Sequence, residues 1–365
     1  MEKSRVVFLD WLRVLACFMV MVVHSCELFY FNDNGDFAID SLSAAFWVSW
    51  VDAACRQAVP LFVMASAFLL FPVNRSTGDF FRRRLMRVVV PFVFWACVYT
   101  AANGDGWGRL LFNFPDAAGH LWFVPMLLGL YLLMPLLSPW AEKVEKKELR
   151  GWLVLWFFTT TFPFVRKLWG ALYGDPSFGA VPYLWGECPW NAFGTFHYVS
   201  GFVGYLLLGL YFRKFIANLN VKRVLAWAVP VGVIGYAIVG GFFYGRIPDA
   251  GGYPVVKPYA TAVDLEMSWE FCSLGVALTV LATFAILKAV TREGKFYTRV
   301  ILPLSQASYG TYLVHMLILT PVGLFYKEIF PVPLTILCTA ATTFLCASGT
   351  SLIVRSIPVI GKRLA

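Results

Sequence analysis

The sequence predicts an all-α polytopic membrane protein with about ten transmembrane helices and both termini in the cytoplasm. Of its 365 residues, 59% are hydrophobic and only 14% are charged, whereas about a quarter of the residues of a soluble domain are charged. The hydrophobic residues form ten stretches able to cross a hydrocarbon core about 30 Å thick. These are residues 7–30, 42–71, 87–102, 120–138, 151–165, 198–213, 223–244, 267–288, 302–326 and 332–355. The fifth is the weakest, because Thr159, Thr160, Thr161 and Pro163 interrupt it.

Positive charges are distributed unevenly between the two sides of this arrangement. If all ten stretches span, 22 of the 30 Lys and Arg residues lie on the side of the N-terminus and six lie on the other. Cytoplasmic loops carry such an excess, so both termini are predicted to be cytoplasmic. The same distribution accounts for the net charge of +9 without a nucleic-acid partner, and we expect membrane lipids to surround the protein.

The first hydrophobic stretch carries four ionisable residues: Asp10, Arg13, His24 and Glu27. On a helix that turns about 100° per residue, Arg13 and His24 fall within about 20° of one another. Asp10 lies one turn before this pair and Glu27 one turn after it, so all four share a face. A charge in hydrocarbon costs roughly 2.5–3.5 kcal/mol even on lenient insertion scales. The face must therefore meet protein or water, and we expect it to be a functional site.

Polar residues also interrupt the second stretch, where Asp52, Arg56 and Gln57 precede Pro60. A proline removes one backbone hydrogen bond and kinks a helix, here near Arg56. The freed carbonyls beside an arginine suit a polar cavity. A kink relieved by Gln57 and neighbouring helices explains the same pattern equally well.

Two arginines, Arg84 and Arg87, lie one helical turn apart at the start of the third stretch. At that spacing both guanidinium groups can reach one anion. The alternative is a topology signal combined with contacts to anionic lipid headgroups.

Four more residues are candidates for contact with a substrate. His120 and Trp122 open the fourth stretch, Glu270 is the most deeply placed acid of the eighth, and His315 lies near the middle of the ninth. Each histidine has a structural alternative: an interface position for His120, and a hydrogen bond to a neighbouring helix for His315. The four histidines of the chain lie in separate segments, so no local pattern supports a metal site, and we expect none. Aromatic residues in the long outer segment 166–197 fit stacking on sugar rings or resting on lipid.

Several familiar catalytic signatures are absent, including a P-loop, a GxSxG elbow, a dinucleotide fingerprint and an HExxH zinc site. What remains fits acyl transfer. His24 can act as a general base oriented by a carboxylate such as Glu27. A phosphate-bearing donor held by Arg13, Arg84 and Arg87 can extend an arm toward His24, which lies about 16 Å from Arg13 along the helix axis. That distance is comparable with the extended pantetheine arm of coenzyme A.

Six segments carry a resemblance to the acyltransferase-3 family of bacterial integral-membrane O-acyltransferases. LDWLRVLACFMVMVVH contains the family's R-x10-H pattern at Arg13 and His24, and RRLMR matches its RxxR element at Arg84 and Arg87. The other segments, in the family's order, are VPLFVMASAFLL, HLWFVPMLLGLYLLMPLL, GYLLLGLYF and SYGTYLVHMLIL. The resemblance covers nearly the whole chain, which is similar to stand-alone members that acetylate envelope sugars. Ser66 matches the family serine, but Ala67 replaces the usual glycine, a change that bears on close helix approach there.

The resemblance implies a single transmembrane domain over residues 1–365 in the bacterial cytoplasmic (inner) membrane. It implies transfer of an acetyl group from cytoplasmic acetyl-CoA to a sugar hydroxyl on a lipid-linked or exported glycan. We assign catalysis to His24, Arg13 and Asp10, and donor binding to Arg13, Arg84 and Arg87. The candidates for acceptor binding are Glu27, Arg56, Ser66, His120, Trp122, Glu270 and His315.

Two alternatives remain open. One is a transporter of a lipid-linked sugar or small anion, although the sequence shows neither the repeats nor the paired broken helices common in transporters. The other keeps the same fold but uses a succinyl or another acyl donor.

Overall fold

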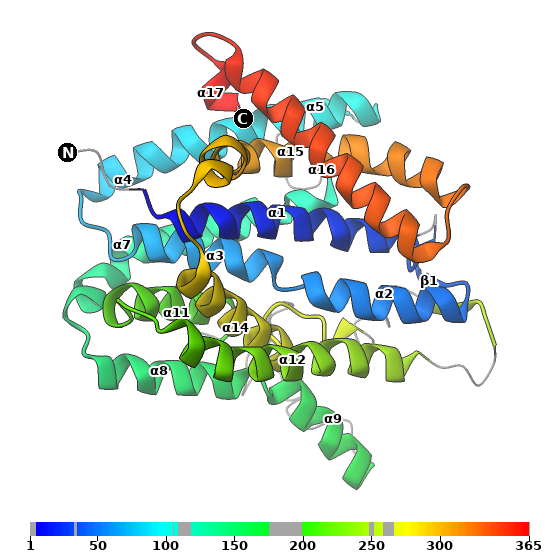
Figure 1. The fold of residues 1–365 in the computed structure, drawn as a ribbon, viewed down its shortest axis with the longest axis horizontal. Helices are drawn as coiled ribbons and strands as arrows, with labels where there is room; N and C mark the ends of the chain where they lie inside the picture. The colour runs from blue at the N-terminus through cyan, green and yellow to red at the C-terminus, as the bar shows by residue number, and fades with distance from the viewer. Residues whose placement is uncertain are drawn as a thin grey trace. The chain divides into compact units, whose positions relative to one another are not determined.

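The computed structural model describes residues 5–32, 35–104, 106–108, 118–174, 199–247, 252–257 and 266–364. Its regular structure is almost entirely helical (Figure 1). Two short strands, β1 (Phe37–Ile39) and β2 (Val255–Lys257), pair antiparallel with Phe37 opposite Lys257. Most of the aromatic segment 166–197 lies outside the described residues.

The chain forms two compact units. The first comprises Met1–Leu28, Pro72–Pro139 and Thr291–Ala365, and the second comprises Phe29–Phe71 and Trp140–Val290. The first unit contains α1 (Val7–Glu27), α4 (Thr77–Arg84), the π-helix η1 (Leu85–Val89), α5 (Val90–Asn103), the 3-10 helix η3 (Gly119–Trp122), most of α7 (Phe123–Lys143), the π-helix η5 (Tyr297–Ile301), α15 (Leu302–Lys327), α16 (Val332–Ser356) and α17 (Gly361–Leu364). The second contains both strands, α2 (Leu42–Cys55), α3 (Ala58–Leu70), α8 (Lys146–Thr159), α9 (Phe162–Tyr173), α11 (Phe202–Phe215), α12 (Val221–Arg246) and α14 (Leu274–Val290).

Among the described residues, seven helical segments are long and apolar enough to cross a membrane. They are Val7–Glu27, Leu42–Leu70, Thr77–Asn103, Gly119–Lys143, Val221–Arg246, Tyr297–Lys327 and Val332–Ser356. The apolar helix α14 is shorter. The predicted class, an all-α multi-pass membrane protein, is confirmed. The number of ten spans and the cytoplasmic location of the termini stay predictions.

The fifth predicted stretch, 151–165, is not one helix. Helix α8 ends at Thr159 and α9 begins at Phe162. The hydroxyls of Thr159, Thr160 and Thr161 each donate to the backbone carbonyl three residues earlier. Pro163, in the first turn of α9, has no N–H to continue the helical ladder. Hydroxyls that bond the local backbone, followed by this proline, explain the break.

The second predicted stretch is interrupted at Arg56 and Gln57, between α2 and α3. The side-chain amide of Gln57 donates to the carbonyl of Ala54 at 2.9 Å. This contact satisfies one carbonyl next to the break, as the kink-relief interpretation of the sequence requires. Pro60 then lies inside the first turn of α3, where a missing N–H leaves no helical bond unmade.

Helices α3 and α11 approach closely in the second unit even though Ala67 stands where the resemblance predicts a glycine. A Cβ built on Gly209 of α11 would lie 2.6 Å from the Cβ of Ala67. The glycine that permits the close approach is therefore supplied by α11, so the substitution of alanine for glycine at 67 does not separate the two helices.

Helix α1 is the central element of the first unit. It packs against α15 and α16 (Figure 1), and its apolar face, including Leu12 and Ala16, is fully buried. Near its C-terminal end, a Cβ added to Gly323 of α15 would lie 2.4 Å from Leu28. The lack of a side chain at Gly323 therefore lets α15 lie close to the end of α1, where His24 and Glu27 lie.

Candidate active site

Three histidines that are far apart in the sequence converge in the first unit. The ring centroids of His24 on α1 and His315 on α15 are 5.2 Å apart, and those of His315 and His120 on η3 are 4.8 Å apart. His24 and His120 are separated by 6.4 Å between centroids. Two of the sequence candidates for acceptor binding are therefore neighbours of the predicted base.

His24 forms a pair with Glu27, one turn further along α1. The Nδ1 atom of His24 lies 2.9 Å from Oε2 of Glu27. A carboxylate only accepts hydrogen bonds, so in the neutral ring Nδ1 carries the proton and Nε2 carries the lone pair. The His24 side chain is 16% exposed and that of Glu27 is 30% exposed. The carboxylate thus fixes the tautomer that leaves Nε2 able to accept a proton.

Tyr312 connects the other two imidazoles. Its hydroxyl donates to the backbone carbonyl of His120, and its own carbonyl lies 2.5 Å from Nδ1 of His315. A carbonyl accepts, so Nδ1–H of His315 is the donor and Nε2 is the acceptor nitrogen. The Tyr99 ring lies 5.1 Å from that of His120, and its hydroxyl bonds the Leu313 carbonyl. These contacts fix the His315 ring through its Nδ1–H and the backbone of His120 through its carbonyl, while the Tyr99 ring packs against that of His120.

Three nitrogens of this cluster are buried without a hydrogen-bond partner among the described residues. They are Nδ1 and Nε2 of His120 and Nε2 of His315. His315 is fully buried and His120 is 5% exposed. Leaving a buried polar group unsatisfied costs about 1–3 kcal/mol, and such groups in native proteins generally have a partner. The arrangement is that of a polar site whose hydrogen-bonding capacity is completed by water or a ligand.

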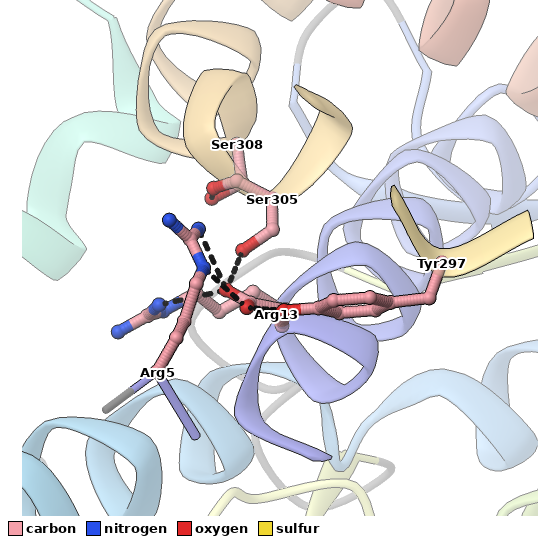
Figure 2. Close-up of polar contacts among 6 residues, drawn as sticks. Arg5, Arg13, Tyr297, Ser305 and Ser308 are labelled. Atoms are coloured by element: carbon pink, nitrogen blue, oxygen red, sulfur yellow. Dashed lines mark hydrogen bonds and ion pairs between the residues drawn. The ribbon is translucent and has the colours of Figure 1, made fainter. Parts of the chain in front are cut away.

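A second polar cluster surrounds Asp10 in the first turn of α1, and Figure 2 shows Arg5, Arg13, Tyr297 and Ser305 of this cluster. Its carboxylate accepts hydrogen bonds from Arg5 at 2.7 and 3.1 Å, from Tyr297 at 2.8 Å and from Ser305 at 2.6 Å. Arg13 lies 3.5 Å from the same group. The hydrogen bond from Arg5 to Asp10 raises the pKa of the Arg5 guanidinium. Asp10 therefore anchors the start of α1 to η5 and α15 and fixes the position of Arg13.

This placement separates Asp10 from His24. The two residues are fourteen apart on one unbroken helix, or about 21 Å along its axis. The structure therefore places Asp10 where it can position Arg13 but not where it can touch His24. Within α1, the carboxylate that contacts the histidine is Glu27.

The two other arginines that the sequence predicts to bind the donor lie next to and inside a π-helical turn. Arg84 ends α4 and Arg87 lies inside η1. The sequence predicts one ordinary α-helical turn between the two arginines, but the π-helical turn gives them a different separation. The Arg84 guanidinium lies 5.7 Å from the centroid of the Tyr131 ring. The Nε of Arg84 is buried without a partner among the described residues, whereas Arg87 is exposed. π-turns inside helices are frequent at functional sites.

Three of the predicted acceptor residues belong to the second unit. Arg56 contacts Asp52 at 2.7 Å and lies 4.3 Å above the ring of Trp269. Glu270 follows that tryptophan in the segment before α14. Ser66 lies half-buried on α3. Trp122, a predicted acceptor residue of the first unit, is the last residue of η3 and follows His120 by two positions.

Sequence reasoning missed the hydroxyl groups that orient these clusters, namely those of Tyr99, Tyr297, Ser305 and Tyr312. Their signal is weak because tyrosine and serine in apolar helices are common and only the folded contacts distinguish them. SYGTYLVH does place Tyr312 one turn before His315, a spacing that puts two side chains on one helix face. Among the described residues, no group of three or more His, Cys, Asp or Glu side chains is arranged to hold a metal ion.

These features define a class: a multi-pass membrane protein whose first helix carries a carboxylate–histidine pair near one end and an ionic cluster around a buried aspartate near the other. A family model described as an acyltransferase domain, Acyl_transf_3, matches residues 6–351. The chain therefore belongs to the acyltransferase-3 family and is a membrane acyltransferase, as the resemblance predicted. Searches of curated proteins and of solved structures found no match.

Proposed function

We propose that this acyltransferase moves an acetyl group from cytoplasmic acetyl-CoA to a sugar hydroxyl of a lipid-linked or exported cell-envelope glycan, in the bacterial inner membrane. The observation that carries the proposal is the 2.9 Å contact between Nδ1 of His24 and Glu27, within a chain of the acyltransferase-3 family. Because that contact leaves the lone pair on Nε2, His24 is equipped to take a proton from an alcohol.

The proposed reaction is a direct transfer. Nε2 of His24 removes the proton of the acceptor hydroxyl as its oxygen bonds to the thioester carbonyl carbon. The carbon–sulfur bond then breaks, and the imidazolium returns the proton to the departing coenzyme A thiolate. Glu27 stabilises the positive charge that develops on His24, as a carboxylate does in other acid–base pairs. The products are the acetyl ester and free coenzyme A, with no change in oxidation state.

The donor's phosphates are assigned to Arg13, Arg84 and Arg87. Two observations support a phosphate-bearing molecule here. The Arg84 Nε–H is buried without an acceptor in the part of the chain that the structure describes, and Asp10 contacts Arg13 from one side at 3.5 Å. Guanidinium groups bind phosphate oxygens in a planar, two-pronged geometry. α1 is unbroken between Arg13 and His24, so their separation of about 16 Å along the axis is rigid and matches an extended pantetheine arm.

The acceptor is assigned to the His24 end of α1. Within the first unit, we expect the acceptor to contact His120, Trp122 and His315. Glu27 acts on the acceptor indirectly, through its hydrogen bond with His24. Arg56, Ser66 and Glu270 of the second unit stay proposed acceptor contacts on the basis of the sequence alone.

Inverted membrane vesicles test this function, because they present the cytoplasmic face to added donor. Vesicles containing the full-length protein are given acetyl-CoA labelled in the acetyl group, and label in the glycolipid and glycan fraction is counted. We expect transfer that is lost in His24→Gln and retained in Glu328→Gln, an exposed control at the end of α15. Equal labelling by wild type and His24→Gln would refute the base assignment. A parallel assay with labelled succinyl-CoA separates the two donors, and a transporter would show no transfer that depends on His24.

A further inference from the structure

The fully buried acceptor nitrogen of His315 is not used by the transfer reaction itself. Its Nδ1–H is committed to the Tyr312 carbonyl of its own helix. That contact leaves Nε2 as the atom able to meet other elements, and the rings of His24 and His120 are the neighbours, at 5.2 and 4.8 Å between centroids. Nε2 has no partner among the described residues.

The chemistry of this nitrogen specifies its ligand. An imidazole nitrogen that bears a lone pair needs a hydrogen-bond donor, and His24 Nε2 is an acceptor of the same kind. A single alcohol has one O–H to give. One hydroxyl therefore cannot donate to both rings, whereas two hydroxyls on neighbouring carbons can each meet one.

We propose that the acceptor presents a vicinal diol, with the reacting hydroxyl donating to Nε2 of His24 and the neighbouring hydroxyl donating to Nε2 of His315. This inference rests on the proposed function and adds a substrate class to it: a sugar modified at a ring position whose neighbouring hydroxyl is free. His315 is then a positioning residue that determines specificity. Its tautomer is fixed by the Tyr312 backbone carbonyl, and the Tyr312 hydroxyl also binds the backbone carbonyl of His120, so one residue contacts both histidines that lie next to the base.

The assignment separates acceptors by structure. A ring hydroxyl flanked by a second free hydroxyl is a substrate. An isolated alcohol leaves the His315 nitrogen buried and unpaired, and sites with an unpaired buried polar group discriminate strongly against the analogue that causes it. A primary alcohol on an exocyclic carbon, with no adjacent hydroxyl, falls in the disfavoured group.

Two small probes of the same composition test the inference: cyclohexane-1,2-diol, with adjacent hydroxyls, and cyclohexane-1,4-diol, with separated ones. The purified full-length protein in detergent is melted with each diol, and the shift in Tm reports binding because a ligand of the native state stabilises it. We expect cyclohexane-1,2-diol to raise Tm more than cyclohexane-1,4-diol. In His315→Phe, which keeps a ring but has no acceptor, the two shifts become equal. His315→Gln, whose amide oxygen accepts a hydrogen bond, should keep part of the preference.

The same probes serve as acetyl acceptors. With acetyl-CoA as donor, the initial rate of ester formation on the adjacent diol should exceed that on the separated diol by about tenfold or more, and His315→Phe should bring the two rates together. Equal Tm shifts and equal rates on the wild-type protein would overturn the inference even if His315→Phe did not fold. A preference that persists in a folded His315→Phe would overturn it as well.

The two proposals fail in different ways. A Tm preference for the adjacent diol with no transfer of labelled acetyl would remove the proposed function and keep the diol site. His24-dependent transfer to vesicle glycans with no preference for the adjacent diol would support the proposed function and overturn the assignment of a vicinal-diol acceptor.

Discussion

The substitution Glu27→Gln tests whether the carboxylate beside His24 contributes to the rate of transfer. Glutamine has nearly the same shape as glutamate, and its amide oxygen can still accept from Nδ1 of His24. The charge is lost, however, and with it the stabilisation of the imidazolium that forms as the hydroxyl proton is taken. The change therefore acts on the transition state rather than on binding of either substrate.

The size of the effect follows from the geometry. A hydrogen bond to a charged group contributes about 1.5–3 kcal/mol. The contact is short, at 2.9 Å, but Glu27 is 30% exposed, so solvent screening favours the lower end of that range. We expect kcat to fall about tenfold, with the KM values for acetyl-CoA and for the acceptor nearly unchanged.

The assay is the initial rate of labelled acetyl transfer over a range of acetyl-CoA concentrations, measured in vesicles. Glu328→Gln is the matched control, because it makes the same chemical change on an exposed side chain at the end of α15. A Glu27→Gln enzyme with wild-type kcat, or one whose only defect is a raised KM, would show that the pair is structural.

Three further substitutions test the donor side and the fold. Arg13→Ala should raise the KM for acetyl-CoA about tenfold by removing one charged contact to phosphate. Arg82→Ala, which removes an exposed arginine close to Arg84 in the sequence, should leave this KM unchanged. Equal effects of the two substitutions would argue for a general loss of positive charge. Asp10→Asn should lower Tm and weaken acetyl-CoA binding, because the carboxylate is 2% exposed and accepts three side-chain hydrogen bonds of 2.8 Å or less; an unchanged Tm would show that Asp10 does not anchor α1. Gly209→Ala should destabilise the protein by about 1–3 kcal/mol through overpacking, since its Cβ would lie 2.6 Å from that of Ala67. Adding Ala67→Gly to this variant should restore part of the lost stability. The absence of any rescue would contradict the close contact between α3 and α11.

The class of the fold and one face of α1 could be predicted from the sequence because both depend on local patterns. Hydropathy identifies apolar helices, and the spacing of eleven positions from Arg13 to His24 fixes a common face whatever surrounds the helix. The contact between His24 and Glu27 is local in the same sense, since residues three apart on a helix are neighbours.

The rest of the site depends on contacts between distant segments. His120 and His315 are separated by almost two hundred residues, and no periodicity within either segment indicates that their rings meet. The π-turn at Leu85–Val89 has no distinctive sequence signal either, so the sequence predicts ordinary α-helical spacing between Arg84 and Arg87. The sequence around Ala67 could not show that α3 still packs closely against a neighbour. The glycine that allows the close approach is Gly209, which lies on the other helix of the pair, α11.

The most direct test of the account is mass spectrometry of the surface glycans of cells that make either the wild-type protein or His24→Gln at equal membrane abundance. We predict acetyl esters on ring hydroxyls of the wild-type glycan and none above the level of cells lacking the protein when His24 is replaced. The same acetyl esters in both samples would contradict the role of His24 as the base that joins a cytoplasmic thioester to a sugar hydroxyl.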